Sequence, residues 1–357
     1  MTVGKKQVDI REGNKSAVIE HMLQGETTLV ELQDKLLLSH TALNKIIREL
    51  MSQGVVRKSD VRMIEFGRPS AIYDINPDCG VAVAIALSDR YLEIFYVDMK
   101  GFEINNCCQT VSFTDADTLL DYIHAQLIRL SGHYRIKGKK ISTFCVSIPA
   151  YSLFGLDLEE WKKRLAERLG DVLRDTETVF DKKTEFICIA EKRYGNLRDY
   201  ADSALICDFE NRISAALFSK SGIYSGIRTK PGNLNGMLGF DFWEEACRLT
   251  DLSYDELFQS YAVNLSVKNK IEDLSRPLFE RLKAVLAFMD IPFLILCGDV
   301  SRLGDNFLNF ALNIIGDDVR VVYSGIKNRS PACAGAVWLA TYKSLKRIVL
   351  RKSKNLL

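Results

Sequence analysis

The pattern of hydrophobic and polar positions changes once along the chain, near residues 74–78. Before that point, short stretches with helical hydrophobic spacing alternate with charged residues. After it, the apolar run VAVAIAL at 81–87 is typical of a buried strand. The sequence shows neither an internal repeat nor a low-complexity linker. The change predicts two parts of unequal length, an N-terminal domain of residues 1–75 and a body of residues 76–357.

The N-terminal domain has the hydrophobic spacing of three short helices, predicted over residues 15–23, 29–36 and 40–53. Thr28 is suited to cap the second helix, because Glu31 stands three residues later and completes a capping box. A short turn then leads to the third helix. Helix, turn and longer amphipathic helix is the plan of a helix-turn-helix.

The third helix has one apolar and one polar face. Ser39 is a good N-cap for it and Gly54 ends it. The apolar face carries Leu43, Ile46, Ile47 and Leu50. The opposite face carries His40, Thr41, Asn44, Lys45 and Arg48. Two short strands are predicted next, over 55–58 and 62–66, and the segment Gly67-Arg68-Pro69 follows them.

The body alternates strands and helices. Strands are predicted over 80–87, 91–98, 102–113, 140–148, 204–209, 214–219, 293–297 and 320–323. Helices are predicted over 115–130, 158–169, 240–250, 253–262, 275–289, 305–315 and 332–347. Three strands in succession, followed by strand–helix alternation, favour an α/β fold with a mixed sheet.

Composition places the chain among ordinary globular proteins. Of 357 residues, 47% are hydrophobic and 26% charged, which excludes a mainly disordered, collagenous or coiled-coil protein. The 48 basic and 46 acidic residues give a net charge of +2, so the chain is not basic throughout. The sequence contains neither a long apolar span nor a secretory leader pattern, and no membrane partner is expected. Nine cysteines without a CxxC motif favour reduced thiols and a cytoplasmic protein.

The polar face of the third helix has the chemistry of a DNA reader. Asn44 can bond adenine, while Lys45 and Arg48 can bond guanine or phosphate. Ser39 and Thr41 can donate to phosphate, and Arg68 in a wing can enter a minor groove. We therefore assign contacts with double-stranded DNA to Ser39, His40, Thr41, Asn44, Lys45, Arg48 and Arg68.

The residues LSHTALNKIIRELMSQGVV, followed by GRPSAIYDINPDCG, resemble the winged helix-turn-helix of repressors of the ROK family. In that family this module precedes a sugar-kinase-like body. The segments VAIALSDRYLEIFYVDMKG, IAEKRYGN, GIYSGIRTKPGNLNGM, LILCGDVSR and SPACAGAVWLA are similar to body motifs of the family and stand in the same order.

The resemblance implies a winged helix-turn-helix joined to a two-lobed, actin-like (ribonuclease H-like) body. The first lobe would span about 76–198 together with a C-terminal helix at 332–350, and the second lobe about 199–331. In related repressors, a sugar or sugar phosphate bound between the lobes alters DNA binding. In the family's kinases, the same cleft phosphorylates a hexose with ATP and magnesium.

Kinase chemistry is not expected here. The family's Asp-x-Gly-Gly-Thr turn aligns to residues 86–90, which contain no glycine, and its second glycine-rich turn aligns to residues 210–216, which begin with Glu210. Phosphate cradles need small residues so that backbone N–H groups can approach the anion. The family's Asn-Asp pair aligns to Lys182-Lys183, which removes the carboxylate base, although a shift of one or two residues would bring in Asp181.

The sugar and zinc motifs are altered as well. Glu-x-Gly-His aligns to residues 233–236 (Asn-Leu-Asn-Gly), and the zinc-binding cysteine cluster is missing, so neither a metal nor a cofactor is expected. Asn233 and Asn235 could hydrogen-bond a polyol, and Lys183 could attract an anionic sugar. The alternatives are a polar loop for the asparagines and a solvated charge for the lysine.

The sequence thus predicts a DNA-binding regulator, a repressor of carbohydrate-utilisation genes. Its body is expected to bind a sugar or sugar phosphate effector and to form a homodimer or tetramer, because one recognition helix reads few base pairs. One rival is a ROK-type sugar kinase with an appended helical module. The other is a scaffold whose winged module binds protein.

Overall fold

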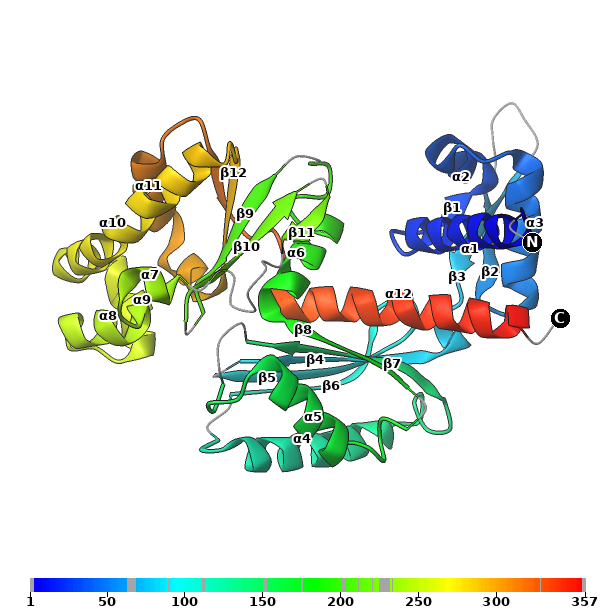
Figure 1. Cartoon of the computed structure of the whole chain (residues 1–357), viewed down its shortest axis with the longest axis horizontal. Helices are drawn as coiled ribbons and strands as arrows, with labels where there is room; N and C mark the ends of the chain where they lie inside the picture. The colour runs from blue at the N-terminus through cyan, green and yellow to red at the C-terminus, as the bar shows by residue number, and fades with distance from the viewer. Residues whose placement is uncertain are drawn as a thin grey trace.

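A computed structural model covers the chain. It describes residues 3–62, 69–88, 90–110, 113–149, 153–174, 176–200, 203–210, 212–219, 221–224, 232, 234–327 and 329–354. For residues 3–9, 62, 235 and 351–354 it describes the backbone alone. Three sheets organise these residues, and helices join them (Figure 1).

The N-terminal module is a three-helix unit with a small antiparallel sheet. Its elements are α1 (Val3–Met22), β1 (Thr27–Thr28), α2 (Leu29–Leu36), α3 (His40–Ser52), β2 (Val56–Arg62) and β3 (Ser70–Ile75), with strand order β1-β3-β2. The predicted second and third helices are confirmed, with Thr28 and Ser39 at the N-caps.

Two predictions for this module were wrong. The first helix begins at Val3, not near residue 15, because its early turns carry almost no apolar face that periodicity could detect. The first wing strand, predicted over 55–58, is longer: β2 runs to Arg62, with a register shift between Lys58 and Asp60. Of the second predicted wing strand, residues 63–66 lie outside the described residues, and the described partner of β2 is β3. The predicted minor-groove residue, Arg68, lies outside the described residues.

Lobe 1 of the body is built on a five-stranded sheet of order β6-β5-β4-β7-β8. Its elements are β4 (Val81–Leu87), β5 (Tyr91–Val97), β6 (Glu103–Thr110), α4 (Ala116–Ser131), β7 (Ile141–Ile148), α5 (Leu158–Arg168) and β8 (Glu177–Lys182). Strands β4, β7 and β8 run parallel, whereas β5 and β6 are antiparallel to their neighbours. The mixed sheet is therefore confirmed.

Strand β4 shows why the two faces of this sheet are covered differently. Its larger side chains, Val81, Val83, Ile85 and Leu87, pack in one cluster with α4 and α5. Its alanines, at 82, 84 and 86, face the other cluster, which contains α12 (Pro331–Lys354). Small side chains on that face let α12 lie close to the strand backbone.

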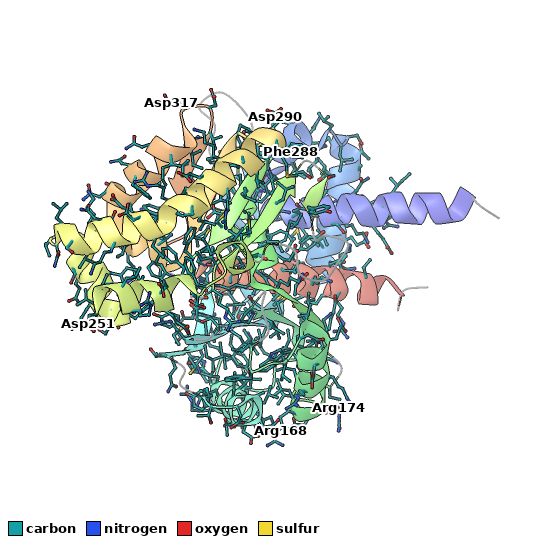
Figure 2. The ribbon with its side chains drawn as sticks, turned by 60° about the vertical axis from the view of Figure 1, so that its left-hand side comes forward. Arg168, Arg174, Asp251, Phe288, Asp290 and Asp317 are labelled. Carbon is teal, nitrogen blue, oxygen red and sulfur yellow. The ribbon has the colours of Figure 1, made fainter. Side chains whose placement is uncertain are left out.

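Lobe 2 has a second five-stranded sheet, of order β11-β10-β9-β12-β13. Its strands are β9 (Ala204–Asp208), β10 (Ser214–Ser219), β11 (Gly222–Tyr224), β12 (Phe293–Cys297) and β13 (Arg320–Tyr323). Its helices are α7 (Asn235–Leu238), α8 (Phe242–Thr250), α9 (Tyr254–Tyr261), α10 (Leu265–Phe288) and α11 (Gly304–Ile315). Figure 2 shows this lobe with Asp251, Phe288, Asp290 and Asp317 at its surface, and Arg168 and Arg174 on lobe 1 below it.

Some body elements differ from the predictions. Helix α10 starts at Leu265, ten residues before the predicted start, because Asn264 caps it and Pro277 is tolerated inside it. The predicted strands omit β8, a half-buried edge strand, and β11, and the predicted helices omit α6 (Lys183–Arg193) and α7. Short turns of 3-10 helix lie at η1 (Pro77–Cys79) and η2 (Gly298–Leu303).

Helices α6 and α12 pack against each other at the centre of the body. A Cβ atom on Gly335 of α12 would overlap the carbonyl oxygen of Phe186 in α6, so only glycine permits this approach. Helix α12 continues past lobe 1 to α1 of the N-terminal module (Figure 1). One cluster of buried hydrophobic residues runs from Ile19 through Leu345 and Ala336 to Ile295, joining the module, α12 and lobe 2.

Within the described part of the chain, no helix is long and apolar enough to span a membrane. All nine cysteines are unpaired, as expected for reduced thiols, and Cys145, Cys188, Cys207, Cys297 and Cys333 are buried.

The close approach of α12 to α6 at Gly335 predicts that two glycine-to-alanine variants differ in stability. Gly335→Ala should lower the free energy of unfolding by about 1–3 kcal/mol, because the added methyl must push α6 and α12 apart. Gly13→Ala, inside α1 where nothing lies within 4 Å of the added carbon, should raise it by about 0.5–1 kcal/mol. Urea unfolding of both variants checks this, and equal effects of the two changes would contradict the packing described.

Candidate functional site

Helices α2 and α3 are fixed by their caps. The backbone N–H of Glu31 donates to the Thr28 hydroxyl (3.2 Å), and the N–H of Thr28 donates back to the Glu31 carboxylate (2.8 Å). The turn passes through Leu37, which adopts a left-handed conformation (φ 54°) with its side chain almost fully exposed. Ser39 then caps α3 by accepting from the N–H of Ala42 (3.3 Å). These local bonds set the angle between the two helices.

The apolar face of α3 is buried as predicted, and the residues assigned to DNA lie on the other side. His40, Thr41, Lys45 and Arg48 are exposed, and Asn44 is half-buried. Asn44 Nδ2 donates to His40 Nδ1 (3.0 Å), so these two side chains are already paired along the helix. Neither Lys45 nor Arg48 forms an ion pair with another described residue. Both cations are therefore available to phosphate or bases.

Glu49, the acidic residue of α3, is paired with two basic side chains of α1. Glu49 accepts from Arg11 Nη2 (2.6 Å) and from Lys15 Nζ. Partial burial acts to raise the pKa of Glu49, but the hydrogen bonds from Lys15 and Arg11 outweigh it and lower that pKa below its usual value. Because Glu49 is held ionised and paired, it does not cancel the charge of Lys45 and Arg48.

The wing adds two basic side chains that the sequence reasoning did not assign. Arg57 and Lys58 are consecutive in β2 and both are exposed. Their signal was visible in the segment VVRKSD, where a basic pair stands a few residues after the third helix. They add positive charge to the same module as Lys45 and Arg48.

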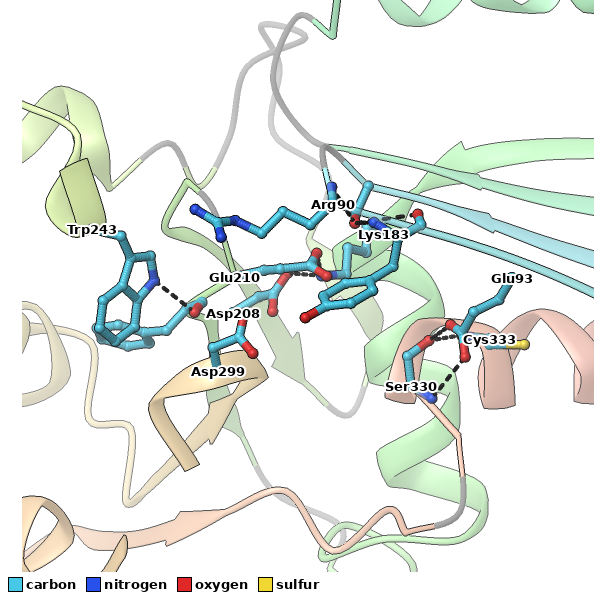
Figure 3. Close-up of polar contacts among 12 residues, drawn as sticks. Arg90, Glu93, Lys183, Asp208, Glu210, Trp243, Asp299, Ser330 and Cys333 are labelled. Carbon is cyan, nitrogen blue, oxygen red and sulfur yellow. Dashed lines mark hydrogen bonds and ion pairs between the residues drawn. The ribbon is translucent and has the colours of Figure 1, made fainter. Parts of the chain in front are cut away.

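The cleft between the two lobes contains a buried ion cluster (Figure 3). Lys183 is the first residue of α6, directly after β8 of lobe 1. Its Nζ lies 2.7 Å from the carboxylate of Asp208, at the end of β9 in lobe 2, and also contacts Glu210. The Lys183 and Asp208 side chains are at least nine-tenths buried. Lys183 is therefore not a solvated charge, which corrects one alternative considered from the sequence.

The cluster shifts the titration of its members. Burial raises the pKa of Glu210 to about 7, with Lys183 opposing the rise and Asp208 adding to it. Burial acts to lower the pKa of Lys183, but Asp208 and Glu210 outweigh it and raise that pKa above its usual value. Asp181, the nearest candidate for a base, accepts from the neighbouring backbone N–H of Lys182 (2.8 Å).

In the turn between β4 and β5, two backbone N–H groups are hydrogen-bonded within the turn itself. The hydroxyl of Ser88 accepts from the backbone N–H of Tyr91 (2.9 Å) and of Arg90 (3.2 Å). Arg90 extends across the cleft, and its guanidinium lies 3.3 Å from the centre of the Tyr254 ring in α9. The Tyr254 hydroxyl donates to Asp299 (2.6 Å). In a phosphate-binding turn these N–H groups would face the anion.

A second polar contact holds the start of α12. The N–H of Cys333 donates to the Ser330 hydroxyl (3.1 Å), which in turn donates to the carboxylate of Glu93 on β5. Glu93 and Ser330 are 237 positions apart, so no sequence motif could have paired them. Pro331 follows as the first helical residue, where its missing N–H costs nothing.

Two adjoining cavities, of about 270 and 230 Å³, remain in the cleft. They share Tyr91, Glu210 and Ser330 in their walls. The larger also contains Glu93 and Lys183. Of the other predicted ligand residues, Asn233 lies outside the described residues, and Asn235 begins α7 with its side chain undescribed. Among described residues, no group of three or more His, Cys, Asp or Glu is placed to hold a metal ion.

Neither a family model nor a curated protein sequence matches the chain. Among solved structures it is similar to a ROK-family transcriptional regulator, a homologue of the Mlc protein of E. coli, with a TM-score of 0.74 and 14% identity over 96% of this chain and 99% of that one. The chain has the fold of a ROK-family transcriptional regulator. The predicted winged helix-turn-helix and two-lobed, sugar-kinase-like body are thereby confirmed.

Sugar kinases of the ROK family match the chain over a smaller share. A hexokinase from Thermus thermophilus has a TM-score of 0.55 at 13% identity, covering 74% of this chain and 99% of its own. A glucokinase from Streptomyces griseus, solved with glucose and AMPPNP, has a TM-score of 0.55 at 13% identity, covering 73% and 99%. The regulator match leaves out about 4% of this chain, so it must include most of the first 75 residues.

The raised pKa of Glu210 makes stability depend on pH. A carboxyl whose pKa rises on folding, here from 4.5 to about 7, contributes stability that is fully present below 4.5 and is lost as the pH rises through 7. Glu210→Gln should therefore flatten the fall in unfolding midpoint over this pH range, measured by thermal unfolding. Glu280→Gln, an exposed carboxylate of α10, is the control and should leave the wild-type slope. An unchanged slope in Glu210→Gln would contradict the buried cluster.

Proposed function

We propose that the chain is a DNA-binding transcriptional regulator, a repressor of carbohydrate-utilisation genes. Residues 1–75 would bind the operator, and residues 76–357 would bind an effector and join the subunits. The observation that carries the proposal is the pair of exposed cations on α3, Lys45 and Arg48, in a chain that matches a solved ROK-family regulator over 96% of its length. Repression, effector and assembly are inferred from the resemblance to ROK repressors and from the chemistry below.

DNA binding rests on the placement of charge. Lys45 and Arg48 are exposed on α3, and Arg57 and Lys58 are exposed on the wing, so one module offers four cations for phosphate contacts. Asn44 can reach a base edge once it leaves His40. One such helix reads few base pairs, and two copies spaced about 34 Å apart on half-sites would supply specific affinity. A homodimer or tetramer is the assembly that fits this need.

The effector is proposed to act in the cleft. Its cavities are lined by acceptors and hydroxyls, among them Glu93 and Ser330, which suit the hydroxyl groups of a sugar. Lys183 is engaged by Asp208 and Glu210, so an anionic sugar must compete with both for it. A ligand changes DNA binding only if its affinity differs between two lobe arrangements. Helix α12, which begins directly after Ser330 and reaches α1, offers a path from cleft to module.

Sugar phosphorylation is not favoured by the cleft. Phosphoryl transfer needs an anion cradle and a carboxylate base near the hydroxyl. Here the aligned positions provide Lys183 in place of the base, Glu210 at a cradle position and N–H groups bound by Ser88. A kinase stays as the alternative because ROK kinases share the fold of the body.

Removing the two free cations of α3 tests DNA binding. Lys45→Ala with Arg48→Ala should weaken binding to DNA from upstream of the chain's own gene by about ten- to a hundredfold. It should also lower the slope of log affinity against log salt by about 2, because two phosphate or base contacts are lost. Fluorescence anisotropy over a salt series measures both quantities.

The matched control removes two exposed cations from α10, Lys270→Ala with Arg281→Ala. It carries the same change in net charge and should bind DNA as the wild type does. If both double variants lost DNA affinity equally, binding would depend on net charge alone, and the assignment to α3 would be wrong. Salt-independent binding, or none, would instead favour the protein-binding scaffold.

The kinase alternative has its own test. With ATP, magnesium and a panel of hexoses, a coupled assay of ADP release is expected to show no turnover above the rate without sugar. Sugar-dependent turnover that disappears in Asp181→Asn would overturn the proposal and assign Asp181 as the base.

A further inference from the structure

A separate cavity of about 360 Å³ lies beside α12, away from the ion cluster. Its walls come from the β5–β6 turn, the residue after α6, the segment that follows β13, and the first turns of α12. Apart from Ile326, these residues are not those that line the two cleft cavities. Its volume is within the range of small-molecule sites.

The charged groups in its wall are all cations: Lys100, Lys327 and Arg329. Neither Lys327 nor Arg329 forms an ion pair with any described residue. Arg329 instead lies 5.1 Å from the centre of the Phe95 ring, which holds the guanidinium without neutralising it. Lys100 is shared, because its Nζ is 2.6 Å from the buried Asp74 at the end of the module. Two cations that form no ion pair with a described residue therefore face one cavity.

The rest of the wall is aromatic or apolar. Phe102 is 62% exposed and Tyr194 50% exposed, so both rings are accessible to a small molecule. Val337 of α12 lies 3.4 Å from where a Cβ on Gly101 would stand, so this side is tightly packed. The Tyr194 hydroxyl makes no hydrogen bond to another described residue. Partial burial raises the pKa of Tyr194 to about 12, so the hydroxyl keeps its proton and can donate it.

We propose that this cavity is a second ligand site, which takes a small molecule with a planar ring and a phosphate or carboxylate group. Lys327 and Arg329 would bind the anion, and the ring would lie against Phe102 and Tyr194. Guanidinium and ammonium groups suit such anions, and exposed rings favour a flat apolar partner. The inference does not depend on the proposed DNA-binding function, since binding is measured on the protein alone.

Phenyl phosphate is the probe, titrated calorimetrically into the full chain. It should bind more tightly than inorganic phosphate, which lacks the ring, and than benzyl alcohol, which lacks the charge. Raising the salt concentration should weaken its binding. Lys327→Ala with Arg329→Ala should weaken it by at least about tenfold, the loss expected for two charge-assisted hydrogen bonds. Lys100 is left unchanged because Asp74 depends on it.

Three variants distinguish binding in this cavity from binding elsewhere on the protein. Lys270→Ala with Arg281→Ala, on α10, should leave binding unchanged, as should Gln109→Ala in the larger cleft cavity. Phe102→Ala should weaken phenyl phosphate but not inorganic phosphate. The proposal is overturned if the wild type does not bind phenyl phosphate, if the Lys327/Arg329 double variant binds it equally, or if Gln109→Ala abolishes binding. Unfolding midpoints confirm that each variant is folded.

Discussion

The approach of α12 to α6 and to β4 is the constraint on which the arrangement of the molecule depends. Gly335 has no side chain to separate α12 from the backbone of Phe186, and the alanines of β4 leave room on the same face of the sheet. Because small residues line both surfaces, α12 can lie against lobe 1 along its first half. Its second half reaches the N-terminal module. The hydrophobic cluster around it is continuous, so module, lobe 1 and lobe 2 cannot shift independently without opening that cluster.

A buried ion cluster joins the two lobes across the cleft. Lys183 comes from lobe 1, whereas Asp208 and Glu210 come from lobe 2, so their attraction acts across the gap between the lobes. Removing one partner of such a pair leaves the other buried without compensation, at a cost of about 3–5 kcal/mol. Arg90 over Tyr254 adds another bridge. Moving the lobes apart would therefore separate both pairs of groups.

Helix caps and apolar faces that lie within a few residues made several elements predictable from the sequence. Elements without such local signals were placed wrongly or not predicted. Helices α2 and α3 were placed correctly because their caps and apolar faces lie within a few residues of one another. The start of α1 was not predicted because polar turns there have no such signal. The start of α10 lies ten residues before the predicted one, and the helix continues through Pro277. Strand β8 is an edge strand of intermediate burial, so it lacks the apolar run that identified β4.

The sequence by itself determined the amphipathic third helix, the cations on its polar face and the absence of glycine from residues 86–90 and 210–216, because each depends on residues close together in the chain. Only the tertiary structure decided what these two segments contact. Lys183 and Glu210 are 27 positions apart and Glu93 and Ser330 are 237 apart, and both pairs meet only after the two sheets have packed on α6 and α12. The cavity beside α12 was likewise invisible in the sequence, since its cations become neighbours through the turn of β5–β6 and the segment after β13. Burial then gives these contacts their strength, because charges removed from water are screened less than charges at the surface.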